Sequence, residues 1–68
     1  MEKTLEEMTD EVIYKAMLAE RPTLVDMVAT MLEVGQSPAA IEAKMRQRFG
    51  DIQMVRNVRH VAEYLARP

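Results

Sequence analysis

The stretch Val34-Gly35-Gln36-Ser37-Pro38 reads as the end of one helix followed at once by the start of another. Glycine readily adopts the left-handed conformation that commonly ends a helix, and Gly35 is placed to do so. Serine is a preferred N-cap, and proline fits the first helical turn because no backbone donor is needed there. Ser37 and Pro38 therefore predict a new helix. A turn this short fixes the angle between its two helices.

Similar helix-stop and helix-start signals divide the rest of the chain. Pro22 interrupts a first periodic segment, and Thr23 is expected to cap the helix that ends at Gly35. Gly50 and Asp51 mark a further stop and start. The expected helices run over about 4–19, 24–34, 38–49 and 52–66.

Each expected helix carries apolar residues at steps of three and four. In the first helix the expected buried stripe is Leu5, Met8, Val12, Ala16 and Met17. This stripe suits either the core of the domain or the seam of a homodimer. No segment shows strand periodicity, so the prediction is an all-α, compact four-helix domain spanning residues 1–68, with a helix-turn-helix-like region over about 24–66.

The composition favours a folded cytoplasmic protein without a membrane segment. The chain has 68 residues, no cysteine and 49% hydrophobic residues. No apolar run approaches the roughly 20 residues that a membrane helix needs. The acidic start of the chain lacks the basic-then-apolar order of a secretion signal.

Charge is divided unevenly along the chain. Residues 1–35 hold three of the nine basic residues and eight of the eleven acidic ones. Two explanations stay open: the halves attract each other within the fold, or the basic half presents a surface to a charged partner.

The sequence offers no catalytic or metal-binding constellation. It holds one serine, Ser37, and one histidine, His60, and their spacing indicates no nucleophile–base pair. His60 with Glu63 gives only two potential metal ligands, and a site needs more. The prediction is a non-enzymatic protein with no catalytic residue, metal or cofactor.

The last two helices carry residue types that contact nucleic acid. Arginine and asparagine hydrogen-bond to the edges of guanine and adenine, and arginine also contacts phosphates. The predicted DNA-binding residues are Arg46, Arg48, Arg56, Asn57, Arg59 and His60. Binding to double-stranded DNA as a dimer is accordingly the leading functional hypothesis.

A resemblance supports this hypothesis. The turn from Met31 to Pro38, then Ile41, Met45 and Val55-Arg56-Asn57, resembles the helix-turn-helix region of LuxR-type transcription factors over residues 27–65. The resemblance implies that the last helix reads DNA. The chain departs from that pattern in its longer connection over 46–52. A fainter similarity to ubiquitin-associated domains lacks that family's aromatic turn residue, since the turn here is Val34-Gly35-Gln36.

The alternative hypothesis is a protein–protein interaction module, or a small inhibitor that occludes a partner protein. Its contacts would come from the acidic first helix or from a groove rich in methionine, of which the chain has seven. The acidic residues predicted to bind the partner are Glu6, Glu7, Asp10 and Glu11. A homodimer through the first helix is compatible with both hypotheses.

Overall fold

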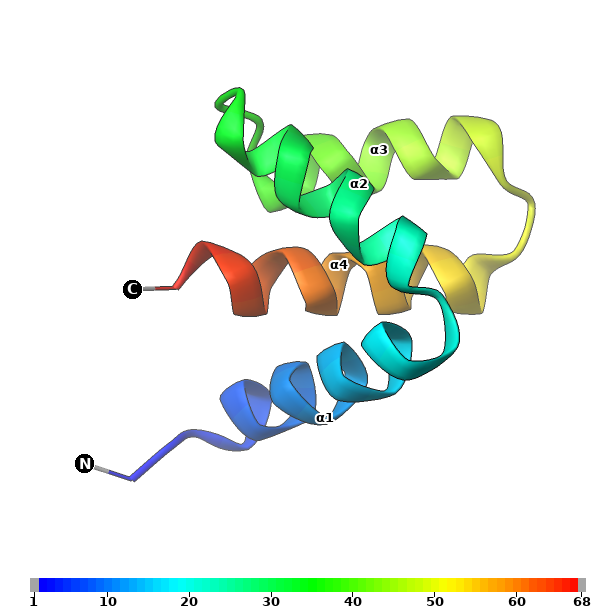
Figure 1. The fold of residues 1–68 in the computed structure, drawn as a ribbon. Coiled ribbons are helices and arrows are strands. Elements are labelled where there is room, and N and C mark those ends of the chain that lie inside the picture. Colours follow the sequence, from blue (N-terminus) through cyan, green and yellow to red (C-terminus); the bar gives the residue numbers. More distant parts are fainter. Residues whose placement is uncertain (1, 68) are drawn as a thin grey trace.

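The computed structural model describes residues 2–67, and over this range the chain forms four α-helices and no strand (Figure 1). They are α1 (Leu5–Glu20), α2 (Pro22–Glu33), α3 (Pro38–Arg48) and α4 (Ile52–Ala66). The all-α prediction is confirmed, and the domain measures 37 × 24 × 18 Å.

Side-chain caps define where three of the helices begin. Thr4 accepts a hydrogen bond from the Glu7 amide, and the Glu7 carboxylate accepts one from the Thr4 amide, which completes a capping box. The Ser37 hydroxyl accepts from the Ala40 amide, as predicted. The Asp51 carboxylate accepts from the Met54 amide in the same way. Each cap satisfies a backbone donor that the helix itself leaves without a partner.

The start of α2 differs from the prediction. Thr23 lies inside α2 rather than at its N-cap, which is Arg21 and which makes no side-chain capping hydrogen bond. Pro22 explains the difference, because proline at the first helical position needs no capped donor and has its backbone angle already set. As a result, Arg21 alone separates α1 from α2.

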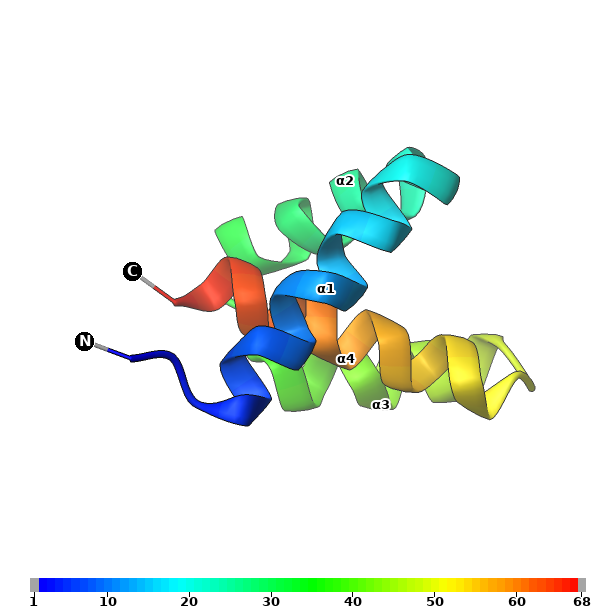
Figure 2. The same cartoon turned by 90° about the horizontal axis from the view of Figure 1, so that it is seen from below.

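Helix α4 lies at the centre of the molecule. It contacts α1, α2 and α3, whereas α1 and α3 do not contact each other within residues 2–67. Figure 1 shows α4 between α1 on one side and the α2–α3 pair on the other. Viewed from the α1 side, α1 lies in front of α4 with no other helix over it (Figure 2).

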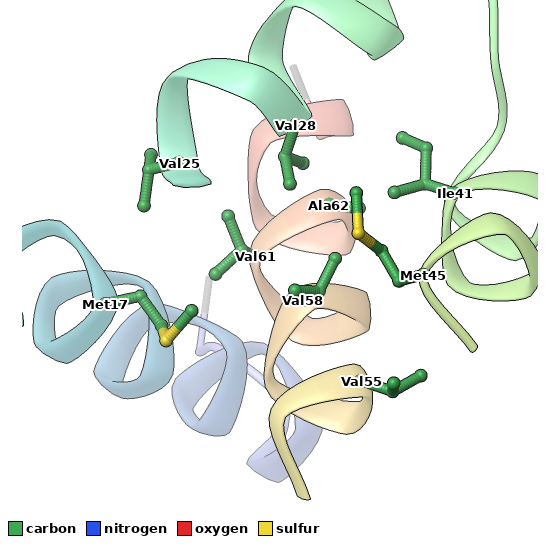
Figure 3. Close-up of a cluster of buried hydrophobic side chains, with 9 residues drawn as sticks. All are labelled: Met17, Val25, Val28, Ile41, Met45, Val55, Val58, Val61 and Ala62. Atoms are coloured by element: carbon green, nitrogen blue, oxygen red, sulfur yellow. The ribbon is translucent and has the colours of Figure 1, made fainter. Parts of the chain in front are cut away.

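The hydrophobic core forms where the other helices meet α4 (Figure 3). Its members are Met17, Val25, Val28, Ile41, Met45, Val55, Val58, Val61 and Ala62. Four of the nine come from α4, which accounts for its central position. Each large side chain in this cluster contributes about 1.5–3 kcal/mol by leaving water.

Phe49 lies four residues after the buried Met45, at the step that would extend the buried face of α3, but it is 38% exposed. Helix α3 ends at Arg48, and Phe49 has an extended backbone with φ −126°. Because the helix ends one residue before Phe49, the side chain of Phe49 does not continue the buried face that Ile41 and Met45 form.

Candidate functional site

Asp10 is the one buried charged residue among those that the structure describes. Its side chain is 1% exposed on the inner side of α1. His60 Nδ1 lies 2.6 Å from one carboxylate oxygen, and Arg67 donates a hydrogen bond to the other. A buried carboxylate is tolerated when it is paired and hydrogen-bonded in this way.

The prediction that Asp10 belongs to an acidic partner-binding surface is therefore wrong. Its carboxylate faces α4 and is not available to a partner. His60, predicted to contact DNA, is turned toward α1 by the same contact. The hydrogen bond from Arg67 to Asp10 raises the pKa of Arg67, so this guanidinium stays charged. The stacked rings of Tyr14 and Tyr64, with centroids 4.6 Å apart, add a second α1–α4 contact.

Two further residues of the predicted DNA-binding set make contacts within the chain. Arg59 lies 3.1 Å from Glu42 on α3 and 3.5 Å from Glu63 on its own helix. The Asn57 side chain accepts a hydrogen bond from Gln53. Forming these contacts orients both side chains along the protein surface.

The remaining three residues of that set are exposed, and Arg46 and Arg48 lie on different sides of α3. Arg46 is near Glu42, at 3.8 Å, on the side of α3 that meets Arg59. Arg48 instead lines a hollow beside α2 together with Met31. Arg56 is exposed on α4. The six predicted residues are therefore distributed over several surfaces, with acidic side chains among them.

The acidic residues of α1 also divide. Glu7 belongs to the capping box, while Glu6 is exposed. Glu11 lies 2.6 Å from Lys3, and the hydrogen bond and charge of Lys3 lower the pKa of Glu11. A lowered pKa means that this pair stabilises the fold at neutral pH and is lost as pH falls through the lowered value. Both side chains are partly exposed, so the effect on stability is small.

Of the predicted buried stripe of α1, Met17 is buried in the core, whereas the other four residues face solvent. Leu5 is 79% exposed, Val12 64% and Met8 45%. Ala16 and Ala19 are exposed on the same side of the helix. We call Leu5, Met8, Val12, Ala16 and Ala19 the outer face of α1. The residues of α1 that contact the rest of the domain are Asp10, Ile13, Tyr14 and Met17.

The reason is that α1 is apolar on two sides. Residues 10, 13, 14 and 17 recur at steps of three and four just as the outer face does. The sequence did not indicate that residues 10, 13, 14 and 17 form the buried side, because an aspartate such as Asp10 is usually exposed to solvent unless it is paired. The signal that could have revealed it is the pair Ile13 and Tyr14 beside Met17.

Methionine lines two shallow hollows near α2. One of 410 Å³ is lined by Leu24, Met27, Phe49 and Met54, among others. The second, of 470 Å³, is lined by Met27, Met31 and Met45 with polar residues of α3. These are the surfaces that correspond to the predicted methionine-rich groove.

In residues 2–67, no group of three metal-ligating side chains is close enough to hold an ion. No helix in that range has the length and hydropathy needed to cross a membrane. No protein-family model matches the sequence, and no curated protein or solved structure is similar to it.

Proposed function

We propose that this chain is a small non-enzymatic recognition protein that binds a protein partner through the outer face of α1. The observation that carries the proposal is the exposure of Leu5, Met8 and Val12 along one line of a single helix. Isolated exposed apolar residues are common on protein surfaces, but a contiguous apolar stripe rimmed by polar residues marks an interaction site.

The chemistry of the stripe suits another helix. Apolar residues at steps of three and four, as on this face, insert into a groove or pair with a second amphipathic helix. The rim supplies the charges Glu11 and Lys15, which would set the orientation of the partner. The rigid α1–α4 contact holds the stripe in place, so that little order has to be gained on binding.

DNA binding, the leading hypothesis from the sequence, is a second candidate. Its support is the exposure of Arg46, Arg48 and Arg56 near the α3–α4 connection. Against it, a recognition helix has to enter the major groove. Here α4 is flanked by α1 and α3, and Arg59 and His60 contact acidic side chains.

Photo-cross-linking in the cells that naturally produce the chain tests the proposal. A benzophenone amino acid would replace Val12 on the outer face of α1 or, as the matched control, Ala43 on the exposed side of α3. The expected result is a discrete protein adduct from position 12 and none from position 43. Adducts from neither position, or equal adducts from both, would contradict the proposal.

A gel-shift at low salt tests the second candidate. If the chain binds DNA, retardation should weaken as salt rises and weaken further in Arg56→Ala, since each phosphate contact releases counterions. No retardation at micromolar protein would remove DNA as the partner.

A further inference from the structure

The outer face of α1 changes in character from one end to the other. The large side chains Leu5 and Met8 lie in its first half, Val12 at its middle, and Ala16 and Ala19 in its second half. The three larger side chains are all exposed, and so are the two alanines. A helix that packed against this face would therefore fit best with small side chains opposite Leu5 and Met8 and large side chains opposite Ala16 and Ala19.

Charge follows the same direction. The first part of the helix is acidic, with Glu6, Glu7 and Glu11. Lys15 follows one turn after Glu11, and its charge contributes to the lowered pKa of Glu11. At the C-terminal end Glu20 is the last residue of the helix and Arg21 its C-cap, so the second half carries Lys15 and Arg21 against one acidic residue. A suitable partner helix would be basic where this one is acidic.

We infer that the partner that covers the outer face of α1 is the α1 helix of a second copy of this chain, packed antiparallel about a two-fold axis at Val12. This inference rests on the proposed function and names its partner. An antiparallel copy meets both requirements at once, because it reverses the order of side-chain size and the order of charge.

Helix geometry gives the register. The outer face from Leu5 to Ala19 is about 21 Å long at 1.5 Å per residue. With the axis at Val12, Leu5 of one copy lies opposite Ala19 of the other, and Met8 opposite Ala16. Large side chains thus pack on small ones at both ends, while the two Val12 side chains meet at the centre. Such matching of large with small residues fills the interface without voids.

The same register pairs charges along one edge. At 100° per residue, Glu11 and Lys15 lie on the same edge of the outer face. A two-fold axis between antiparallel helices brings this edge against the same edge of the second copy. Lys15 of each copy is then offset from Glu11 of the other by about 3 Å along the helices, within reach of an ion pair. Flanking charges of this kind set the orientation of paired helices.

Parallel pairing is the alternative that the residues disfavour. It would place the acidic N-terminal turns of both copies side by side, where like charges repel. It would also leave Ala16 and Ala19 opposite their own equivalents, so that the helices touch at Leu5 and separate at the other end. The antiparallel arrangement also aligns the two helix dipoles favourably.

Sedimentation equilibrium tests the inference, over about 10 μM to about 1 mM of the whole chain. The wild type should pass from monomer to dimer, and Val12→Glu should weaken the dimer about tenfold or more because two carboxylates meet at the axis. Ala43→Glu adds the same charge on exposed α3 and should leave the dimer unchanged. Val12 is mostly exposed, so Val12→Glu should retain wild-type helicity by circular dichroism.

Engineered disulfides test the orientation, since the chain has no cysteine of its own. Under mild oxidation, Leu5→Cys and Ala19→Cys chains should cross-link to each other when mixed. Neither should cross-link efficiently alone. Leu5→Cys chains that cross-link readily to themselves would overturn the antiparallel arrangement.

Different results would contradict the proposed function, which is protein binding by the outer face of α1, and the inference that the partner is a second copy. A wild type that stays monomeric to the highest concentration would overturn the inference. If position 12 still cross-links to a different protein, the proposed function stands without it. If the chain is monomeric and position 12 gives no adduct, both fall.

Discussion

At the scale of single residues, Asp10 is the residue whose contacts join α1 to the C-terminal part of the chain. A carboxylate that is 1% exposed contacts His60 and Arg67, which lie 50 and 57 residues further along the chain. These contacts select which of the two apolar sides of α1 turns inward. They also place Leu5, Met8 and Val12 outward, so the candidate binding surface depends on a buried ion pair on the opposite side of the same helix.

Replacing Asp10 with alanine should therefore lower the free energy of unfolding by about 2–4 kcal/mol, because two charge-assisted hydrogen bonds are lost in a buried place. A domain of this size has only about 3–5 kcal/mol to lose. Glu11→Ala, one residue on, is the matched control and should have a much smaller effect, because the Glu11 side chain is partly exposed and its pair with Lys3 lies at the surface. Urea denaturation followed by circular dichroism measures both. Equal midpoints for the two variants would contradict the role given to Asp10.

At the scale of elements, the two glycine-containing connections differ physically. Gly35 has φ +95° and ends α2 in the left-handed region, whereas Gly50 has no such angle. A Cβ at either position would meet nothing within 4 Å. Any cost of adding a methyl group there comes from the backbone alone.

Gly35→Ala should thus destabilise the domain by about 1 kcal/mol or more, since an L-residue resists positive φ. Gly50→Ala should be neutral or stabilising by up to about 1 kcal/mol, because it reduces the freedom of the unfolded chain. Thermal unfolding of the two variants beside the wild type gives the comparison. A loss in Gly50→Ala as large as that in Gly35→Ala would show that the connections do not differ in this way.

The elements also show how far the sequence alone could go. Gly35, Ser37 and Asp51 act locally, and the helix ends that they predict are found in the structure. The orientation of α1 could not be predicted, because residues 5, 8, 12 and 16 and residues 10, 13, 14 and 17 have the same periodicity. Tertiary contacts distinguish them: Asp10 with His60 and Arg67, Tyr14 with Tyr64, and Met17 with the core. The sequence also placed His60 and Arg59 on an open face, because their partners Asp10 and Glu42 lie on other helices.

At the scale of the whole molecule, the division of charge is partly internal. Asp10 from the acidic half pairs with His60 and Arg67 from the basic half. Glu42 contacts both Arg59 and Arg46 within the basic half. These contacts reduce the basic character of the surface around α4. The outer face of α1 remains as an exposed apolar surface, on a helix that lies in front of α4 with no other helix over it in the view of Figure 2.

The central proposal is that the outer face of α1 binds the same face of a second copy of this chain. Amide chemical shifts measured by NMR as the wild-type concentration is raised test it directly, residue by residue. The account predicts shifts that move at Leu5, Met8, Val12, Ala16 and Ala19, with those of Arg46, Arg48 and Arg56 unchanged. Shifts that stay constant along α1, or that move instead around the α3–α4 connection, would contradict it.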